Sequence, residues 1–125
     1  MKRVLLDSDV IIDILRGFKE TIEIVDKLFK ESELYISGIT EVEVFAGKDA
    51  EKIQKRKLIS ELLSQFKKIN PDNEIFRIAG EFRRKYGVSI PDCIIAATAY
   101  SIDADLFTRN INDFKRIREI RVFEE

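Results

Sequence analysis

Hydrophobic residues in this chain form two kinds of pattern, short unbroken runs and longer stretches with a period of about 3.6 residues. Short apolar runs flanked by turn residues are typical of strands that are buried on both faces, as in a parallel sheet. Most of the strand-like segments are runs of this kind rather than alternations of apolar and polar residues. The predicted strands are Val4–Leu6, Leu34–Ile36, Phe66–Ile69, Leu106–Thr108 and Arg121–Phe123.

The periodic stretches predict helices that bury one face, because residues three and four positions apart share one side of a helix. Gly17, Gly47 and Gly87 follow such stretches in the position of a C-terminal cap, and Pro71 and Pro91 stand where helices begin. Strands that alternate with helices predict a layered α/β domain. The helical segments are Asp9–Arg16, the stripes Ile22–Phe29 and Ile59–Phe66, Thr40–Ala46, Pro71–Tyr86 and the segment after Pro91.

Composition limits the partners of the protein. A chain of 125 residues is long enough for one domain with a normal hydrophobic core. Lys and Arg number 22 and Asp and Glu number 23, so the formal net charge is −1, and a nucleic acid would have to be bound by a local basic patch. No stretch approaches the roughly 18 apolar residues of a membrane helix. No signal-peptide core is present either, so we expect a cytoplasmic protein without membrane contact.

Two absences narrow the chemistry. The chain has no histidine, which excludes Ser–His nucleophiles, histidine general bases and His-ligated zinc or iron. Its one cysteine, Cys93, lies in an apolar run and is expected to be a small buried side chain, so neither a disulfide nor a Cys-rich metal site is predicted. A hydrolase of this composition would depend on carboxylates and a metal ion.

Acidic residues stand at the junctions between predicted strands or turns and the helices that follow them: Asp7, Glu43, Asp92 and Asp113. Each has an ordinary explanation, because a carboxylate in the first turn of a helix caps free amides and suits the helix dipole. The capping alternatives are Asp7 or Asp9 for a Val10–Leu15 helix, Glu43 in a capping box with Thr40, Asp92 after Pro91, and Asp113 after Asn110.

Taken together, the acids favour a metal site. Ligands of an open α/β sheet bind beyond the carboxyl ends of its parallel strands. Carboxylates gathered at that edge repel one another unless a cation holds them together, and hard oxygen ligands suit Mg²⁺ or Mn²⁺. Two such ions about 4 Å apart can activate water and stabilise the leaving oxygen of a phosphodiester. The pattern therefore indicates metal-dependent phosphodiester hydrolysis.

Four segments carry these acids: VLLDSD at 4–9, ISGITEVE at 36–43, IPDCIIAA at 90–97 and FTRNINDF at 107–114. In their order and their residues, these segments resemble the motifs of the PIN-domain nucleases, and most closely those of the VapC-type toxins of toxin–antitoxin pairs. The resemblance covers essentially the whole chain. It implies a PIN-like three-layer α/β/α sandwich with a short, mainly parallel central sheet, and a metal-dependent endoribonuclease that hydrolyses RNA.

The resemblance also assigns roles to the acids, with Mg²⁺ or Mn²⁺ as the cofactor. It implies that Asp7 and Asp92 bind metal directly. Glu43 would bind metal or orient a metal-bound water, and Asp113 would complete the site or help to hold a second ion.

The resemblance also suggests residues that would support the metal ligands, and this chain departs from the family pattern at two positions. Ser8 and Thr108 are expected to hydrogen-bond the metal-binding residues. Many relatives have an acid where this chain has Asn110, so the fourth carboxylate must be Asp113, and a second ion has one charged ligand fewer. Asp9 stands where a neutral polar residue is common. We expect Asp9 to cap a helix, with an additional acid beside the site as the alternative.

The substrate and protein partners are also implied by the resemblance. VapC-type toxins form homodimers and are silenced by a small antitoxin, so a homodimer and a cognate antitoxin are expected here. Arg109 is the favoured contact to RNA because it lies between a strand end and Asn110. For Arg16, Lys115 and Arg116, an ordinary role as surface cations is at least as well supported.

Two other functions compete with the nuclease. The segment around Asp7 and Asp9 mimics the nucleophile motif of haloacid-dehalogenase phosphatases, in which Asp7 would form an aspartyl-phosphate. The chain is short for that fold. A PIN-like module that binds RNA or protein without cutting is the second alternative, and the Asn110 departure leaves it open.

Overall fold

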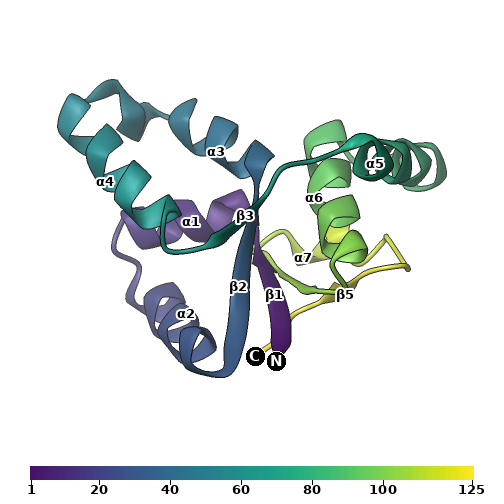
Figure 1. Ribbon diagram of the computed structural model, residues 1–125, viewed down its shortest axis with the longest axis horizontal. Helices are drawn as coiled ribbons and strands as arrows, with labels where there is room; N and C mark the ends of the chain where they lie inside the picture. The colour runs from purple at the N-terminus through teal and green to yellow at the C-terminus, as the bar shows by residue number, and fades with distance from the viewer.

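The computed structural model describes residues 1–125, and its centre is a five-stranded sheet (Figure 1). The strand order is β3-β2-β1-β4-β5, and every neighbouring pair is parallel. All the predicted strands are confirmed, and the sheet is wholly parallel where we expected a mainly parallel one. The strands are β1 (Lys2–Leu6), β2 (Ser32–Ser37), β3 (Lys67–Ile69), β4 (Asp105–Phe107) and β5 (Arg121–Val122).

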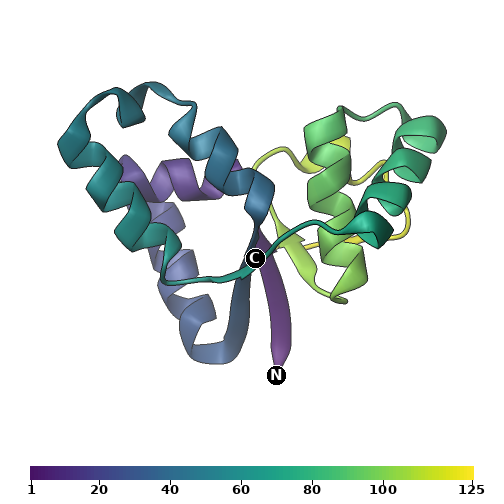
Figure 2. The same ribbon diagram turned by 45° about the horizontal axis from the view of Figure 1, so that its top comes forward.

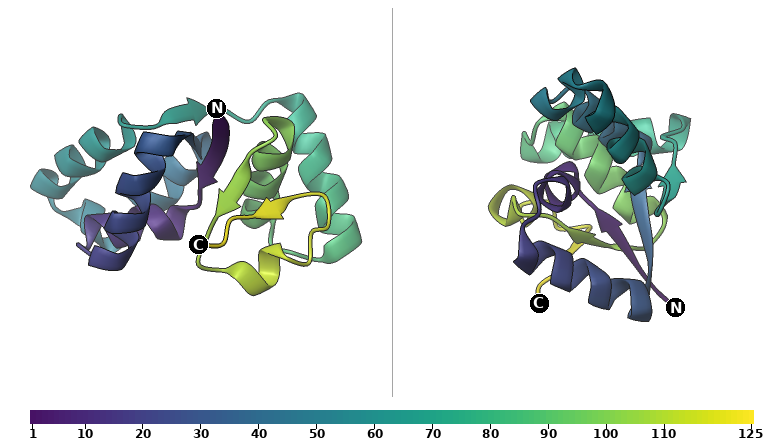
Figure 3. Two further views of the ribbon diagram at one scale, coloured as in Figure 1. Left: turned by 90° about the horizontal axis from the view of Figure 1, so that it is seen from below. Right: turned by 90° about the vertical axis from the view of Figure 1, so that its left-hand side faces the viewer.

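Helices connect the strands and cover both faces of the sheet. The helices are α1 (Ser8–Leu15), α2 (Lys19–Glu31), α3 (Gly38–Phe45), the 3-10 helix η1 (Lys48–Glu51), α4 (Ile53–Leu63), α5 (Asn73–Tyr86), α6 (Ile90–Ser101) and α7 (Ile111–Phe114). In Figure 1, α1 to α4 lie on the left of the sheet and α5 to α7 on the right. The view from below in Figure 3 shows the same two groups of helices with strands between them.

Alternate residues of the central strand build two separate cores. Leu5 packs with Phe82 and other residues of the α5–α7 side. Val4 and Leu6 point to the opposite face and pack with Ile59 and other residues of the α1–α4 side. Because successive strand side chains point to opposite faces, an unbroken apolar run fills both cores at once. The predicted three-layer α/β/α sandwich is confirmed.

Two of the three predicted glycine caps are confirmed. Gly17 and Gly87 have φ of 76° and 67°, the left-handed conformation that glycine adopts without strain. Gly47 also directly follows the C-cap of α3, Ala46, but its φ is −78°, so it does not adopt the left-handed conformation and instead precedes η1 as its N-cap. Pro71 lies in the loop before α5 rather than at its start, because the Asp72 side chain caps that helix.

The order in which strands are added to the sheet reverses at the central strand, β1. From β1 the chain adds β2 and β3 on one side, and it then crosses to α5, α6 and β4 on the other (Figure 2). Such a switch leaves a crevice beyond the carboxyl ends of the two strands that flank it, here β1 and β4. None of the helices combines the length and the apolar character that crossing a membrane would require.

Candidate active site

Asp7 directly follows β1, at the carboxyl ends of the paired strands β1 and β4. Its backbone N–H donates to the Phe107 carbonyl at 2.9 Å, which extends the pairing of β1 with β4 by one residue. Its carboxylate accepts hydrogen bonds from the Ser8 N–H at 2.8 Å and from Thr108 Oγ1 at 2.8 Å. Asp7 is only 6% exposed, and its carboxylate is oriented by these contacts from the start of α1 and from the residue after β4.

The charge on Asp7 is not neutralised by any lysine or arginine, since no ion pair involves this residue. Its pKa is raised from 3.8 to about 7: burial is the main cause, and the negative charges of Asp9 and Asp92 contribute, while the hydrogen bonds from Thr108 and Ser8 act in the opposite direction. A buried carboxylate with acidic neighbours is the electrostatic environment that a cation relieves.

Glu43 is tied to the same edge through Ser8. Ser8 Oγ lies 2.7 Å from Glu43 Oε1 and 3.2 Å from Thr40 Oγ1. The capping-box interpretation of Thr40 and Glu43 is wrong, because α3 begins earlier and Ser37 caps it by accepting the Ile39 N–H at 3.3 Å. Glu43 therefore faces the start of α1 rather than the start of its own helix.

Asp92 and Asp113 approach the edge from the other layer of helices. Asp92 is half-buried in the first turn of α6, whose cap Ser89 accepts the Asp92 N–H at 3.4 Å. Burial raises the pKa of Asp92, and the charge of Asp113 adds to this effect. Asp113 is exposed on α7, where its Oδ2 accepts a hydrogen bond from Asn110 Nδ2 at 3.1 Å. Asn110 thus holds the fourth acid and does not cap α7 with its side chain.

Asp9 is not the cap that we expected. Asp7 occupies the cap position of α1, and Asp9 lies in the first turn with its Oδ2 accepting the Arg109 N–H at 3.1 Å. Its Oδ1 is buried without a hydrogen-bond partner. Burial raises the pKa of this carboxyl too. The alternative, an additional acid beside the site, is the one that the geometry supports.

One residue of this region was not predicted from the sequence. Asp13 is 4% exposed and accepts hydrogen bonds from Arg109 Nη1 at 2.7 Å and from Thr21 Oγ1 at 3.0 Å. Its spacing from Asp9, one helical turn, was a signal that both acids face the strand ends. The favoured RNA contact, Arg109, is therefore already paired with a buried acid, although its side chain remains 57% exposed.

The predicted acids surround one edge of the sheet, but they do not form a closed cage. The charges of Asp9 and Asp92 act on Asp7, and that of Asp113 acts on Asp92. No three of the Asp, Glu and Cys side chains lie close enough together to hold one metal ion directly. Mg²⁺ usually keeps several waters and binds through one or two carboxylates, so these residues fit it. Asp7 and Asp92 would hold the ion, with Glu43 and Asp113 acting through water.

Comparisons with known proteins agree with this geometry. The sequence matches the family model of the PIN domain over residues 4–120. It is 30% identical to ribonuclease VapC10 of Mycobacterium tuberculosis over 124 residues, which cover 94% of this chain and 90% of that protein. Ribonuclease VapC19 of the same species is 28% identical, with 94% and 96% coverage.

Solved structures show the same similarity. A toxin–antitoxin complex from Klebsiella pneumoniae contains a chain that is 31% identical, with a TM-score of 0.83 and coverage of 98% of this chain and 99% of that one. VapBC2 from Rickettsia felis, bound to a DNA fragment from its promoter, has a TM-score of 0.85 at 22% identity, covering 97% of both chains, and shows the fold. This chain belongs to the PIN-domain family and, within it, to the VapC ribonucleases.

Proposed function

We propose that this protein is an endoribonuclease that hydrolyses RNA with Mg²⁺ or Mn²⁺, and that it is the toxin of a toxin–antitoxin pair. The observation that carries the proposal is Asp7, a buried carboxylate at the switch point of the sheet with acidic neighbours and no basic partner. The relatives named as ribonucleases, which match nearly the whole chain, support the choice of RNA as substrate.

The residues of the edge divide the work. Asp7 and Asp92 would hold the cation, and Thr108 fixes the Asp7 carboxylate through its 2.8 Å hydrogen bond. Glu43, oriented by Ser8, would position the attacking water and accept its proton. The water oxygen bonds to phosphorus as the bond to the leaving ribose oxygen breaks, and that oxygen takes a proton from solvent. When bound, Mg²⁺ lowers the pKa of water and neutralises charge that develops on the phosphate. Asn110 holds Asp113 towards the same edge.

We extend the proposal to the protein's partners. Similar chains were crystallised in a toxin–antitoxin complex from Klebsiella pneumoniae and as FitAcB from Neisseria gonorrhoeae, the latter with 26% identity and a TM-score of 0.79. A small cognate antitoxin and a homodimer are accordingly proposed for this chain. Co-expression with the gene product encoded next to it, followed by size-exclusion chromatography with light scattering, tests both.

The central experiment is RNA cleavage by the purified protein with Mg²⁺ or Mn²⁺. Cleavage is expected to stop in EDTA and in Asp92→Asn, which keeps the shape of the side chain and removes its charge. Asp26→Asn is the matched control, because Asp26 is an exposed acid on α2, away from the edge. Metal-independent cleavage, or full activity of Asp92→Asn, refutes the proposal.

The two alternative functions, a phosphatase and a non-cleaving binding module, are not equally supported. Membership of the PIN family removes the support for a haloacid-dehalogenase phosphatase. A non-cleaving module that binds RNA or protein is favoured by one observation, the lack of three acids at direct metal-binding distance from one another. Calorimetry that detects no Mg²⁺ or Mn²⁺ binding at millimolar concentration would select this second function.

A further inference from the structure

A pocket of about 600 Å³ adjoins the acidic edge, between the start of α2 and the loop that joins β4 to α7. Thr108 and Arg109 belong to its wall. Thr108 Oγ1 donates to Asp7 Oδ2 at 2.8 Å, and the Arg109 N–H donates to Asp9 at 3.1 Å. A molecule in this pocket would therefore lie directly beside the carboxylates of the proposed active site.

The pocket carries a half-exposed aromatic ring with a guanidinium over it. Phe18 precedes α2, and 48% of its surface remains exposed. The Arg109 Cζ lies 5.9 Å from the centroid of the Phe18 ring. Ile24, Phe107 and Ile111 add apolar surface. An aromatic ring with a neighbouring guanidinium is a stacking surface that any nucleobase can use, because every base has a π face.

The guanidinium of Arg109 is held in place by a buried carboxylate. The carboxylate of Asp13, which is buried, accepts a hydrogen bond from Arg109 Nη1 at 2.7 Å and another from the Thr21 hydroxyl at 3.0 Å. No other hydrogen bond from the Arg109 side chain to the protein is formed, so most of its N–H donors remain available. A fixed guanidinium of this kind can donate to the acceptor atoms at the edge of a stacked base.

The charges of the pocket favour a base over a phosphate group or an acidic peptide. Lys19 and Arg109 are balanced by Asp13 and Glu20, so the lining has no net charge. A phosphate or an acidic segment would need an excess of positive charge. A neutral aromatic group with hydrogen-bonding edges needs only apolar surface and a few fixed polar atoms.

We propose that this pocket binds an unpaired nucleobase of single-stranded RNA, in the nucleotide next to the phosphate presented to the acidic edge. Phe18 supplies the stacking surface and Arg109 the hydrogen bonds to the base, and Asp13 positions Arg109. This inference rests on the proposed function for the identity of the polymer, and its test measures binding rather than cleavage.

The test is fluorescence anisotropy with a short fluorescein-labelled single-stranded oligoribonucleotide and the full-length protein in EDTA, where metal-dependent cleavage cannot occur. Phe18→Ala removes the ring on which one base would stack, so it is expected to weaken binding of the oligoribonucleotide roughly tenfold. Phe18→Trp keeps a ring and should retain the affinity. Phe76→Ala on α5 is the matched control, because that ring is 51% exposed and lies outside the pocket.

The outcomes separate the two proposals. Equal affinity of wild-type protein and Phe18→Ala, or an equal loss in Phe76→Ala, overturns the nucleobase pocket, as does the absence of any binding. Circular dichroism of each variant shows whether the fold is kept, and rescue by Phe18→Trp distinguishes stacking from a structural role. Binding that depends on Phe18 without cleavage in Mg²⁺ or Mn²⁺ would sustain the pocket and reject the nuclease.

Discussion

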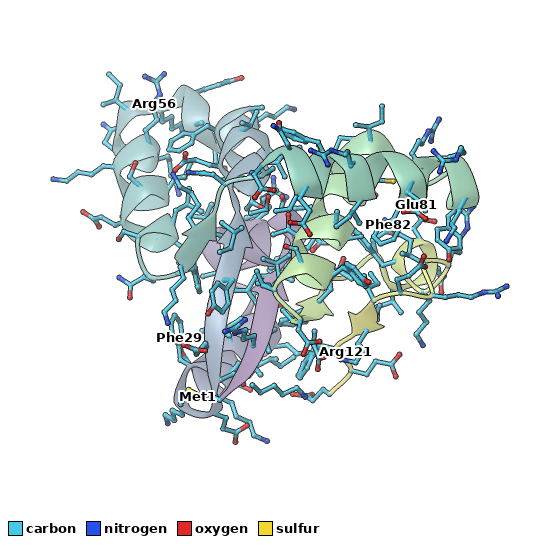
Figure 4. The ribbon with its side chains drawn as sticks, turned by 45° about the vertical axis from the view of Figure 1, so that its right-hand side comes forward. Met1, Phe29, Arg56, Glu81, Phe82 and Arg121 are labelled. Atoms are coloured by element: carbon cyan, nitrogen blue, oxygen red, sulfur yellow. The ribbon has the colours of Figure 1, made fainter.

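The two ends of the sheet each bury an aspartate, and the surroundings of these two residues are opposite. At the amino end, Asp105 is 9% exposed and pairs with Lys2 at 3.0 Å and Arg121 at 2.8 Å. Figure 4 shows Met1 and Arg121 towards this lower end of the molecule, from which β1 runs upwards. At the carboxyl end, Asp7 is 6% exposed and has no basic partner.

The difference appears directly in the ionisation of the two acids. Burial by itself would raise the pKa of Asp105, but the hydrogen bonds and charges of Lys2 and Arg121 outweigh it and lower that pKa. Burial together with the charges of Asp9 and Asp92 raises the pKa of Asp7 to about 7. An acid that is buried without a basic partner costs stability, and such a position is a candidate functional site. Pairing, rather than burial, separates the structural end of this sheet from its functional end.

The largest expected effect is the dependence of stability on pH in EDTA. The pKa of Asp7 is about 7 in the fold against an ordinary 3.8, so the folded state binds more protons between these values and stability falls as the pH rises through this range. The loss is at most about 4 kcal/mol. Urea unfolding at several pH values measures it. Asp7→Asn should remove most of this slope, and an unchanged slope would contradict the comparison.

A second prediction concerns cleavage. Asp7→Asn should lower RNA cleavage by at least roughly a hundredfold, because a neutral amide would bind the cation much more weakly than a carboxylate does. The same change should raise the stability of the metal-free protein near pH 8, where the wild-type carboxylate is charged and buried. Cleavage rates with Mg²⁺ and urea unfolding in EDTA test the two halves separately. Loss of both activity and stability would indicate a structural role instead.

The amino end gives the third prediction. Asp105→Asn breaks the pairs with Lys2 and Arg121 and should lower the free energy of unfolding at pH 7 by about 1–2 kcal/mol, since both partners are more than half exposed and screened. The pKa of Asp105 is lowered, so this contribution is present above its ordinary value and disappears as the pH falls below it. RNA cleavage should be unchanged, and a marked loss of cleavage would argue against the division between the two ends.

The smallest expected effect is that of Ser8→Ala. This change removes the hydroxyl that lies 2.7 Å from Glu43 Oε1, so the glutamate loses its orienting contact. Cleavage should fall by about tenfold or less, since the carboxylate itself remains. Ser60→Ala, an exposed serine on α4, is the control. A loss as large as that of Asp7→Asn would mean that Ser8 contacts the reacting groups itself.

Capping shows where local pattern stops being informative. Thr40 and Glu43 have the spacing of a capping box, but the end of β2 places Ser37 at the start of α3, and Glu43 turns to Ser8. Asp9 has the spacing of a cap as well, yet it accepts a hydrogen bond from Arg109, a hundred positions away. In both cases a distant partner displaced the local one, because the crevice brings strand ends and helix starts together.

The sequence by itself determined the α/β class, the strands and the acidic residues at the junctions with the helices, because apolar periodicity and the edge rule for parallel sheets depend on residues close together in the chain. Only the tertiary structure decided which acids would be paired. Asp13 received Arg109, Asp105 received Lys2 and Arg121, and Asp7 received none. The same side chain is a structural anion or a candidate metal ligand according to the charges that distant segments bring within a few ångströms of it.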